Sequence, residues 1–206
     1  MPPESPTPSP DSLQPLREFV VATSRQLASP ASEAETLAGV SAGLTRLIAR
    51  DDWLPAELAQ AHPQHYCQYL LHADPLGRFS VVSFVWGPGQ RTPIHDHTVW
   101  GLIGMLRGQE VSQPFAPDAS GRMVVQGAPT WLQAGQVEAV SPRLGDIHQV
   151  HNPLADQVSI SIHVYGANIG AVQRWVYAED GSRKPFASGY ANRWVPNLWV
   201  GPGAHA

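Results

Sequence analysis

The stretch TPIHDHTVWGLIGMLRGQE, Thr92 to Glu110, places two histidines two positions apart within a run of residues that favour β-strands. It belongs to a series of short segments after residue 63 in which Val, Ile, Tyr, Phe and Trp alternate with Gly, Pro, Asn and Asp. Several such strands at roughly ten-residue spacing indicate an antiparallel barrel or sandwich.

The part of the chain before residue 63 has a helical pattern instead. Apolar residues recur at helical spacing from Leu13 to Leu27 and from Leu37 to Ile48. Ser32 followed by Glu35 is a capping-box signature, which predicts that the second helix begins there. A short third helix is expected from Leu54 to Gln60. The predicted fold class is therefore α+β and mainly β, with a helical N-terminal cap on an antiparallel β-barrel.

The two ends of the chain have compositions of their own. Residues 1–10 contain five prolines, which predicts a disordered tail. We expect residues 11–206 to form a single domain. It divides into a helical cap over 11–62, the barrel over 63–183, and an irregular C-terminal tail over 184–206, rich in Trp, Pro and Gly.

Composition excludes several classes of protein. The 206 residues are 43% hydrophobic and 15% charged, which is enough to bury a core, and the net charge of −4 provides no basic surface for nucleic acid. Cys67 is the only cysteine, so neither a disulfide framework nor a thiolate zinc site is expected. No apolar run has membrane-spanning length, and MPPESPTPSPDS lacks the features of a signal peptide. We expect a cytoplasmic protein that binds neither nucleic acid nor membranes.

Three histidines form the candidate metal site. Residues two apart on a strand point to the same face, so His95 and His97 are predicted to lie side by side. A further imidazole is offered by His148, on a separate predicted strand. A single histidine is more often a surface or hydrogen-bonded core residue, but this combination favours a metal. Imidazole suits Zn, Cu, Fe and Ni alike, so the histidines do not identify the metal.

Two segments resemble the pair of motifs that marks the cupin superfamily, whose fold is a jelly-roll β-barrel. The first is Gly89-x5-His95-x-His97, closed by Gly108, and the second is Gly145-x2-His148-x3-Asn152. The usual cupin glutamate would fall at position 101, where this chain has Gly101.

A cupin without that glutamate resembles the thiol dioxygenases of the cysteine dioxygenase type I family, whose iron is held by three histidines. The resemblance runs from about Tyr66 to Tyr177, and it implies that Fe(II) is the cofactor, with His95, His97 and His148 as ligands. Animal members carry a cysteine at position 101, cross-linked to a tyrosine through a thioether, whereas bacterial members commonly have glycine. The chain is similar to the bacterial type, so no Cys-Tyr thioether cofactor is expected.

The most specific part of the resemblance is a row of polar residues. In the segment SISIHVY, strand geometry sends Ser161, His163 and Tyr165 to one face and the aliphatic residues to the other. Polar groups inside a barrel need partners there, so simple packing explains the row poorly. The row is similar to the family's Ser-His-Tyr relay, which implies a catalytic role for all three residues, with the tyrosine hydroxyl presented to the iron.

The chemistry that the resemblance implies explains the glycine. Three neutral imidazoles leave the +2 charge of the iron uncompensated. The site therefore suits a substrate thiol, which loses its proton on binding to the metal and becomes a thiolate. A carboxylate at position 101 would compete for the iron, and Gly101 leaves that coordination position open. The implied reaction adds both atoms of O₂ to the sulfur of a small thiol and gives a sulfinate.

Two residues bear on the choice of thiol. Cysteine-selective relatives have an arginine where this chain has Gln68, and glutamine there resembles the 3-mercaptopropionate dioxygenase branch. That branch also has an arginine nine residues after its relay tyrosine, where this chain has Arg174. Gln68, Arg174 and Tyr165 are therefore the predicted substrate-binding residues. The alternatives are a hydrogen-bonded barrel residue for Gln68 and, equally weighted, an exposed strand arginine for Arg174.

Two other functions remain open from the sequence. Another metal-dependent cupin enzyme, such as an isomerase or a ring-cleaving dioxygenase, normally keeps the carboxylate ligand, which Gly101 lacks. A non-catalytic cupin binding module tends to lose metal histidines, and this chain has all three.

Overall fold

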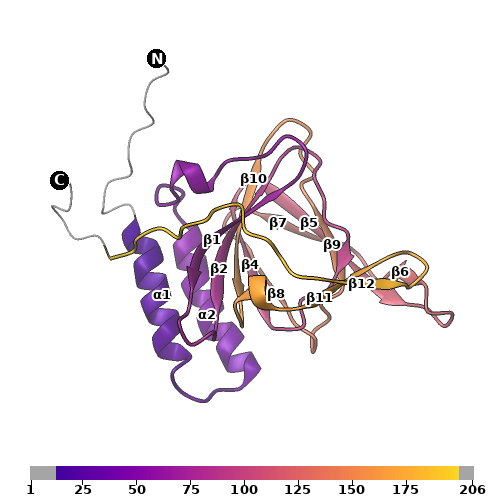
Figure 1. Cartoon of the computed structure of the whole chain (residues 1–206), viewed down its shortest axis with the longest axis horizontal. Helices are drawn as coiled ribbons and strands as arrows, with labels where there is room; N and C mark the ends of the chain where they lie inside the picture. Colours follow the sequence, from indigo (N-terminus) through magenta and orange to yellow (C-terminus); the bar gives the residue numbers. More distant parts are fainter. Residues whose placement is uncertain (1–12, 200–206) are drawn as a thin grey trace.

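In the computed structural model, which describes residues 13–199, two antiparallel β-sheets curl around a shared interior and two helices cover the outside of one sheet (Figure 1). The predicted fold class, α+β and mainly β with a helical N-terminal cap, is confirmed. The predictions for the tail at 1–10 and for the last residues, 200–206, lie outside the described residues.

The helices precede the strands along the chain. The two long helices are α1 (Gln14–Gln26) and α2 (Glu33–Ile48), and the short 3₁₀ turns are η2 (Ala56–Leu58) and η3 (Ile169–Ala171). The strands are β1 (Cys67–Ala73), β2 (Ser80–Trp86), β3 (Ile94–His95), β4 (Gly101–Arg107), β5 (Gln109–Pro117), β6 (Met123–Val125), β7 (Thr130–Gln133), β8 (Val137–Val140), β9 (His148–His151), β10 (Ser159–Tyr165), β11 (Arg174–Tyr177) and β12 (Arg183–Phe186).

The strand order brings distant parts of the chain together. One sheet has the order β1-β2-β10-β4-β8, and the other has the order β12-β11-β3-β9-β5-β6, with β7 paired to β5. The late strand β10 thus lies between the early strands β2 and β4, and pairs with both in antiparallel register. The polar row predicted on β10 is therefore placed at the centre of its sheet.

The predicted capping box begins α2. The Ser32 side chain accepts a hydrogen bond from the Glu35 backbone N–H at 3.3 Å, and the Glu35 carboxylate accepts one from the Ser32 N–H at 2.8 Å. These two contacts satisfy backbone donors that the first turn of a helix leaves free. The start of the second helix is thus confirmed.

The helices pack on one face of the β1-β2-β10-β4-β8 sheet. The core between them includes Leu44 and Ile48 from α2 together with Ile160, Ile162 and Val164 from β10. The alternate residues of β10 face the opposite way, into the space between the sheets. One buried strand thus anchors the helical cap on one face and carries polar groups on the other.

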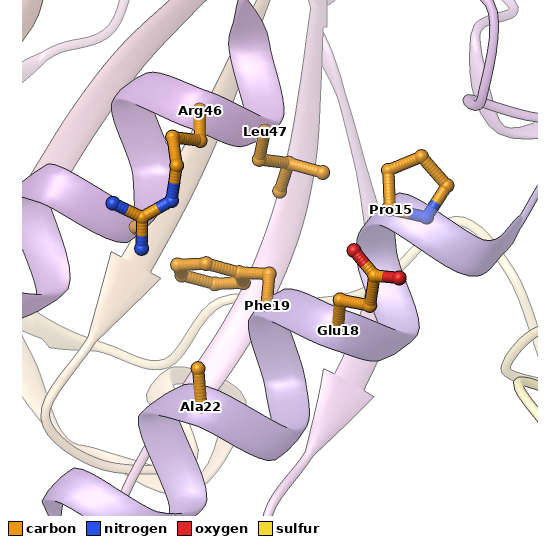
Figure 2. Close-up of a pocket in the computed structure, with 7 residues that line it drawn as sticks. Pro15, Glu18, Phe19, Ala22, Arg46 and Leu47 are labelled. Atoms are coloured by element: carbon orange, nitrogen blue, oxygen red, sulfur yellow. The ribbon is translucent and has the colours of Figure 1, made fainter.

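A cavity of about 300 Å³ lies between α1 and α2 (Figure 2). Its lining consists of Pro15, Glu18, Phe19, Ala22, Gly43, Arg46 and Leu47. The lining contains neither histidine nor cysteine, so this cavity belongs to the packing of the two helices and is separate from the candidate metal site.

The structure differs from the sequence predictions at two places. β12 runs through Phe186, three residues into the segment 184–206 that was predicted to be irregular. β3 ends at His95, so the prediction that His97 shares a strand with it is wrong. Within residues 13–199, no helix has the length and apolar character needed to cross a membrane.

We expect the contact between α2 and β4 to be intolerant of added volume. A Cβ atom at Gly104 would lie 2.9 Å from Cγ of Leu44, a side chain that is fully buried. Gly104→Ala should therefore lower the free energy of unfolding by about 1–3 kcal/mol, as overpacking does. Gly189→Ala is the matched control, because no atom lies within 4 Å of its added Cβ. It should change the stability by less than about 0.5 kcal/mol. Urea denaturation of both variants measures the difference, and equal effects would contradict this account of the packing.

Candidate metal centre and adjoining pocket

His95, His97 and His148 converge between the two sheets. Their side chains offer ligand nitrogens that all lie within 4.8 Å of one another, and all three residues are buried. His95 on β3 pairs directly with His148 on β9 in the sheet register, and His97 follows two residues after His95. The ring centroids lie 4.8–4.9 Å apart. The sequence prediction that these three residues come together is met, although His97 reaches the cluster from a turn.

The turn that carries His97 is held by an aspartate from the second motif. The Asp146 carboxylate accepts hydrogen bonds from the backbone N–H groups of His97 and Thr98, both at 3.0 Å. Thr98 adopts a φ of 60°, a left-handed conformation that is uncommon for a β-branched residue. The two bonds from Asp146 hold this backbone in place and direct the His97 ring toward the other two.

Neighbouring groups hold Nδ1 of two of the rings. Nδ1 of His95 lies 3.1 Å from the Pro93 carbonyl, which can only accept, so this nitrogen carries the proton. Nδ1 of His148 lies 2.9 Å from the Ser112 hydroxyl, and its Nε2 has no partner among the described residues. In both rings the contact at Nδ1 leaves Nε2 as the nitrogen available to a ligand.

The electrostatic environment favours neutral rings. Burial lowers the pKa of His95 to about 4, and it lowers the pKa of His97 and His148 well below the ordinary value for histidine. Nε2 of His148 and Nδ1 of His97 are buried without a hydrogen-bond partner among the described residues. Buried nitrogens without partners are rare in folded proteins. Neutral imidazoles with unpaired nitrogens fit a bound metal ion.

The polar row on β10 forms a continuous line of hydrogen bonds. Ser161 Oγ lies 2.8 Å from Nε2 of His163, and Nδ1 of His163 lies 2.8 Å from the hydroxyl of Tyr165. The Tyr165 ring stacks on His97, with ring centroids 5.6 Å apart. Burial raises the pKa of Tyr165, so its hydroxyl stays protonated. The line thus runs from the interior of the barrel to the edge of the histidine cluster.

Gly101 lies beside the Tyr165 ring. A Cβ atom at this position would lie 3.0 Å from Cδ1 of Tyr165 and 3.1 Å from a methyl group of Val140. A sulfur at position 101 would therefore be adjacent to the tyrosine, but glycine supplies none. Cys67 belongs to the core under the helices, whereas Tyr165 belongs to the cluster between the sheets. The cysteine thus lies on the opposite face of the sheet from the tyrosine.

A pocket of about 120 Å³ opens next to the cluster. It is lined by Tyr66, Gln68, Phe84, Thr92, Pro93, His95, Tyr165, Arg174, Val176, Phe186 and Ser188. The pocket contains His95 of the cluster and Tyr165 at the end of the polar line. It also contains Gln68 and Arg174, the two residues that the resemblance to the family associates with the substrate. Its size suits a small molecule of a few heavy atoms.

Arg174 is buried in this pocket. Only 3% of the residue is exposed, so the alternative of an exposed strand arginine is wrong. Its guanidinium donates a hydrogen bond to Ser188 and lies 4.5 Å from the centre of the Phe186 ring, and its Nε has no partner among the described residues. No carboxylate of residues 13–199 forms a salt bridge with it within 4.0 Å. A buried cation without a counter-charge is costly, and an anionic ligand would offset that cost.

Gln68 contributes a further unpaired polar atom. Its Oε1 is buried without a hydrogen-bond partner among the described residues, and its side chain lines the pocket. On the neighbouring strand, Phe84 stands opposite Gln68 and stacks on His163 with ring centroids 3.9 Å apart. The amide of Gln68 is therefore available to a ligand.

Several residues that build the site were not identified from the sequence. Asp146 orients the turn, Ser112 orients His148, and Glu110 bonds to Ser161. Glu110 and Ser112 are two residues apart on β5, so both point to one face of a buried strand. This alternation is the signal that could have identified them, as it did for the row on β10.

Comparison with known proteins gives a family and partial relatives. The model of a family described as cysteine dioxygenase type I matches residues 27–177. Human cysteine dioxygenase type 1 is 30% identical over 91 residues, which is 43% of this chain and 45% of the human protein. The Bos taurus protein is 29% identical over the same length. The matched segment thus spans less than half of these relatives.

Solved structures with similar folds are more distant. A Klebsiella pneumoniae protein with a double-stranded β-helix domain has a TM-score of 0.46 at 19% identity, covering 60% of this chain and 88% of its own. A cupin superfamily protein from Desulfitobacterium hafniense has a TM-score of 0.43 at 16% identity, covering 58% and 94%.

We expect Ser112→Ala to weaken metal binding without removing a metal-binding nitrogen. The variant loses the hydroxyl that bonds to Nδ1 of His148 and orients the ring, and such losses typically reduce metal affinity by about 10- to 100-fold. Ser83→Ala is the matched control, because Ser83 is buried on the helix-facing side of β2 and its hydroxyl has no partner among the described residues. Competition against a chelator of known affinity measures both variants. Equal affinities would show that Ser112 does not support the site.

Proposed function

We propose that this chain, which belongs to the cysteine dioxygenase type I family, is a non-haem Fe(II) thiol dioxygenase. The reaction adds both atoms of O₂ to the sulfur of a small thiol carboxylate and yields the sulfinate. The observation that carries the proposal is the convergence of three buried neutral histidines beside a small pocket that also contains Tyr165 and Arg174.

In this proposal His95, His97 and His148 are the ligands of the metal. Bound Fe(II) supplies the redox-active Lewis acid that a thiol and dioxygen need in order to react. The donor set consists of imidazoles alone, and the position of a fourth, carboxylate ligand is taken by Gly101. The protein therefore adds no negative charge of its own to the metal, and an anionic substrate can supply it.

The remaining residues bind and orient the substrate. Tyr165 is a catalytic residue whose neutral hydroxyl is held by His163, and His163 by Ser161, through bonds of 2.8 Å each. Arg174 provides the positive charge for the substrate carboxylate, and Gln68 provides an uncharged hydrogen bond. This combination favours 3-mercaptopropionate over L-cysteine, because neither residue offers an anion to the cysteine ammonium group.

We further propose that the enzyme acts in the cytoplasm as a single catalytic domain within residues 11–206. A sequence with one cysteine, Cys67, fits a reducing compartment. The proposed partners of the enzyme are the small thiol and O₂.

The first experiment combines iron content with turnover. Expressed with iron, the wild type should bind about one Fe per chain and form sulfinate while consuming O₂, because three histidines make one site. Alanine at His95, His97 or His148 should remove iron and turnover together. His151→Ala is the matched control, since His151 lies on the same strand as His148 but outside the cluster. It should retain both. A cluster variant with full iron content would exclude that residue as a ligand.

The second experiment tests the choice of thiol. Wild type should show a higher kcat/KM for 3-mercaptopropionate than for L-cysteine. Gln68→Arg installs the charged donor that the cysteine-selective relatives have at this position. It should therefore shift the ratio toward cysteine by about 1–2 kcal/mol, the range for hydrogen bonds to charged groups. Gln64→Arg is the control for added charge, because Gln64 lies outside this pocket. Sulfinate formation from both thiols at one pH gives the ratio. A wild type that prefers cysteine would make the enzyme a cysteine dioxygenase in the strict sense.

A further inference from the structure

The hydrogen-bonded line on β10 continues to a buried glutamate. Glu110 on β5 is fully buried, and its Oε2 lies 2.7 Å from the Ser161 hydroxyl. Its Oε1 has no partner among the described residues, and no Lys or Arg of residues 13–199 forms a salt bridge with it within 4.0 Å. A buried carboxyl without a cation is a candidate for holding a proton.

The Ser161 hydroxyl has three hydrogen-bonding neighbours but only one proton to donate. Its oxygen lies within hydrogen-bond distance of Glu110, of Nε2 of His163, and of Nε1 of Trp86 at 3.1 Å. The indole N–H can only donate, so it always uses one lone pair of the serine. The single serine proton is therefore directed either to Glu110 or to His163, and the protonation of the glutamate decides which.

Each choice fixes the rest of the line. When Glu110 is ionised, Ser161 donates to it and accepts from Nε2–H of His163. Nδ1 of His163 then has a lone pair and accepts from Tyr165, whose proton points away from the pocket. When Glu110 is protonated, it donates to Ser161, Ser161 donates to Nε2, and Nδ1–H donates to the Tyr165 oxygen. The tyrosine proton then points into the pocket.

We propose that Glu110 is the positioning residue that decides whether Tyr165 donates a hydrogen bond into the pocket. The inference rests on the proposed function. With its proton in the pocket, Tyr165 can donate to the substrate carboxylate. With its proton on the side of His163, the tyrosine oxygen can only accept a hydrogen bond from the pocket.

The groups around Glu110 are consistent with a proton taken up near neutral pH. Burial, the largest cause, and the facing carboxylate of Glu138 on β8 together raise the pKa of Glu110 to about 7, although Ser161 and Trp86 act to lower it. Tyr165, at the far end of the line, faces the cation of Arg174 and the phenols of Tyr66 and Tyr190. The carboxyl pKa is raised, so the protonated form is present below about pH 7 and is lost as the pH rises through that value.

The kinetic test compares Glu110→Gln with wild type. The glutamine amide donates to Ser161 at every pH, as a protonated Glu110 would. The ratio of kcat/KM, variant over wild type, cancels the ionisation of the free thiol. It should be constant at low pH and rise about tenfold per pH unit above the pKa of Glu110. In a Tyr165→Phe background the same comparison should give a ratio independent of pH. A ratio in the Tyr165 enzyme that does not change with pH would overturn the proposal.

The second readout does not depend on turnover. In the metal-free full-length protein, ¹⁵N NMR reports which nitrogen of His163 carries the proton, with assignment by His163→Gln. From about pH 5.5 to about pH 8.5, a range that brackets the Glu110 pKa, the proton should move from Nδ1 to Nε2. Glu110→Gln should hold it on Nδ1. Glu138→Gln, which removes only the facing charge, should lower the midpoint and keep the switch.

The two readouts separate the possible failures. A His163 ring that keeps one tautomer across this range in wild type would overturn the inference, whatever the activity. Absence of sulfinate from every thiol, with the tautomer switch intact, would refute the proposed function and would leave Glu110 as the residue that sets the direction of the line.

Discussion

The antiparallel pairing of β10 with β2 and β4 is the constraint on which the site depends. Every residue of this strand is buried, so both of its faces are committed. The aliphatic face packs on α2 and fixes the position of the sheet, and the polar face carries Ser161, His163 and Tyr165 toward the histidine cluster. Because neighbouring strands hold β10 at both edges, the polar groups of the line stay at hydrogen-bond distance from one another.

The sequence predicts those parts of the structure that local patterns control. The capping box at Ser32 and the alternation along β10 each follow from a few neighbouring residues. Helix ends and strand faces depend on such short-range rules, so they can be read without knowledge of the fold. The convergence of His148 with the other two histidines needed the resemblance to the family motifs in addition.

What the sequence could not predict depends on contacts between distant segments. Arg174 was equally well interpreted as exposed, because its burial results from the positions of Phe186 and Ser188 on a later part of the chain. The turn at His97 is set by Asp146, 49 residues further on. Glu110 contacts Ser161 across 51 residues. In each case the sequence alone is equally consistent with an exposed polar residue, and the buried role becomes visible only when the partner segment is known.

The two-faced strand also limits how this protein can change over evolutionary time. Insertion or deletion of one residue within β10 would exchange its faces, sending the serine, histidine and tyrosine under the helices and the aliphatic residues into the pocket. Both the cap and the chemistry would then fail together. Lineages of this chain are therefore expected to vary β10 by substitution at constant length, and to place insertions and deletions in the loops at the surface.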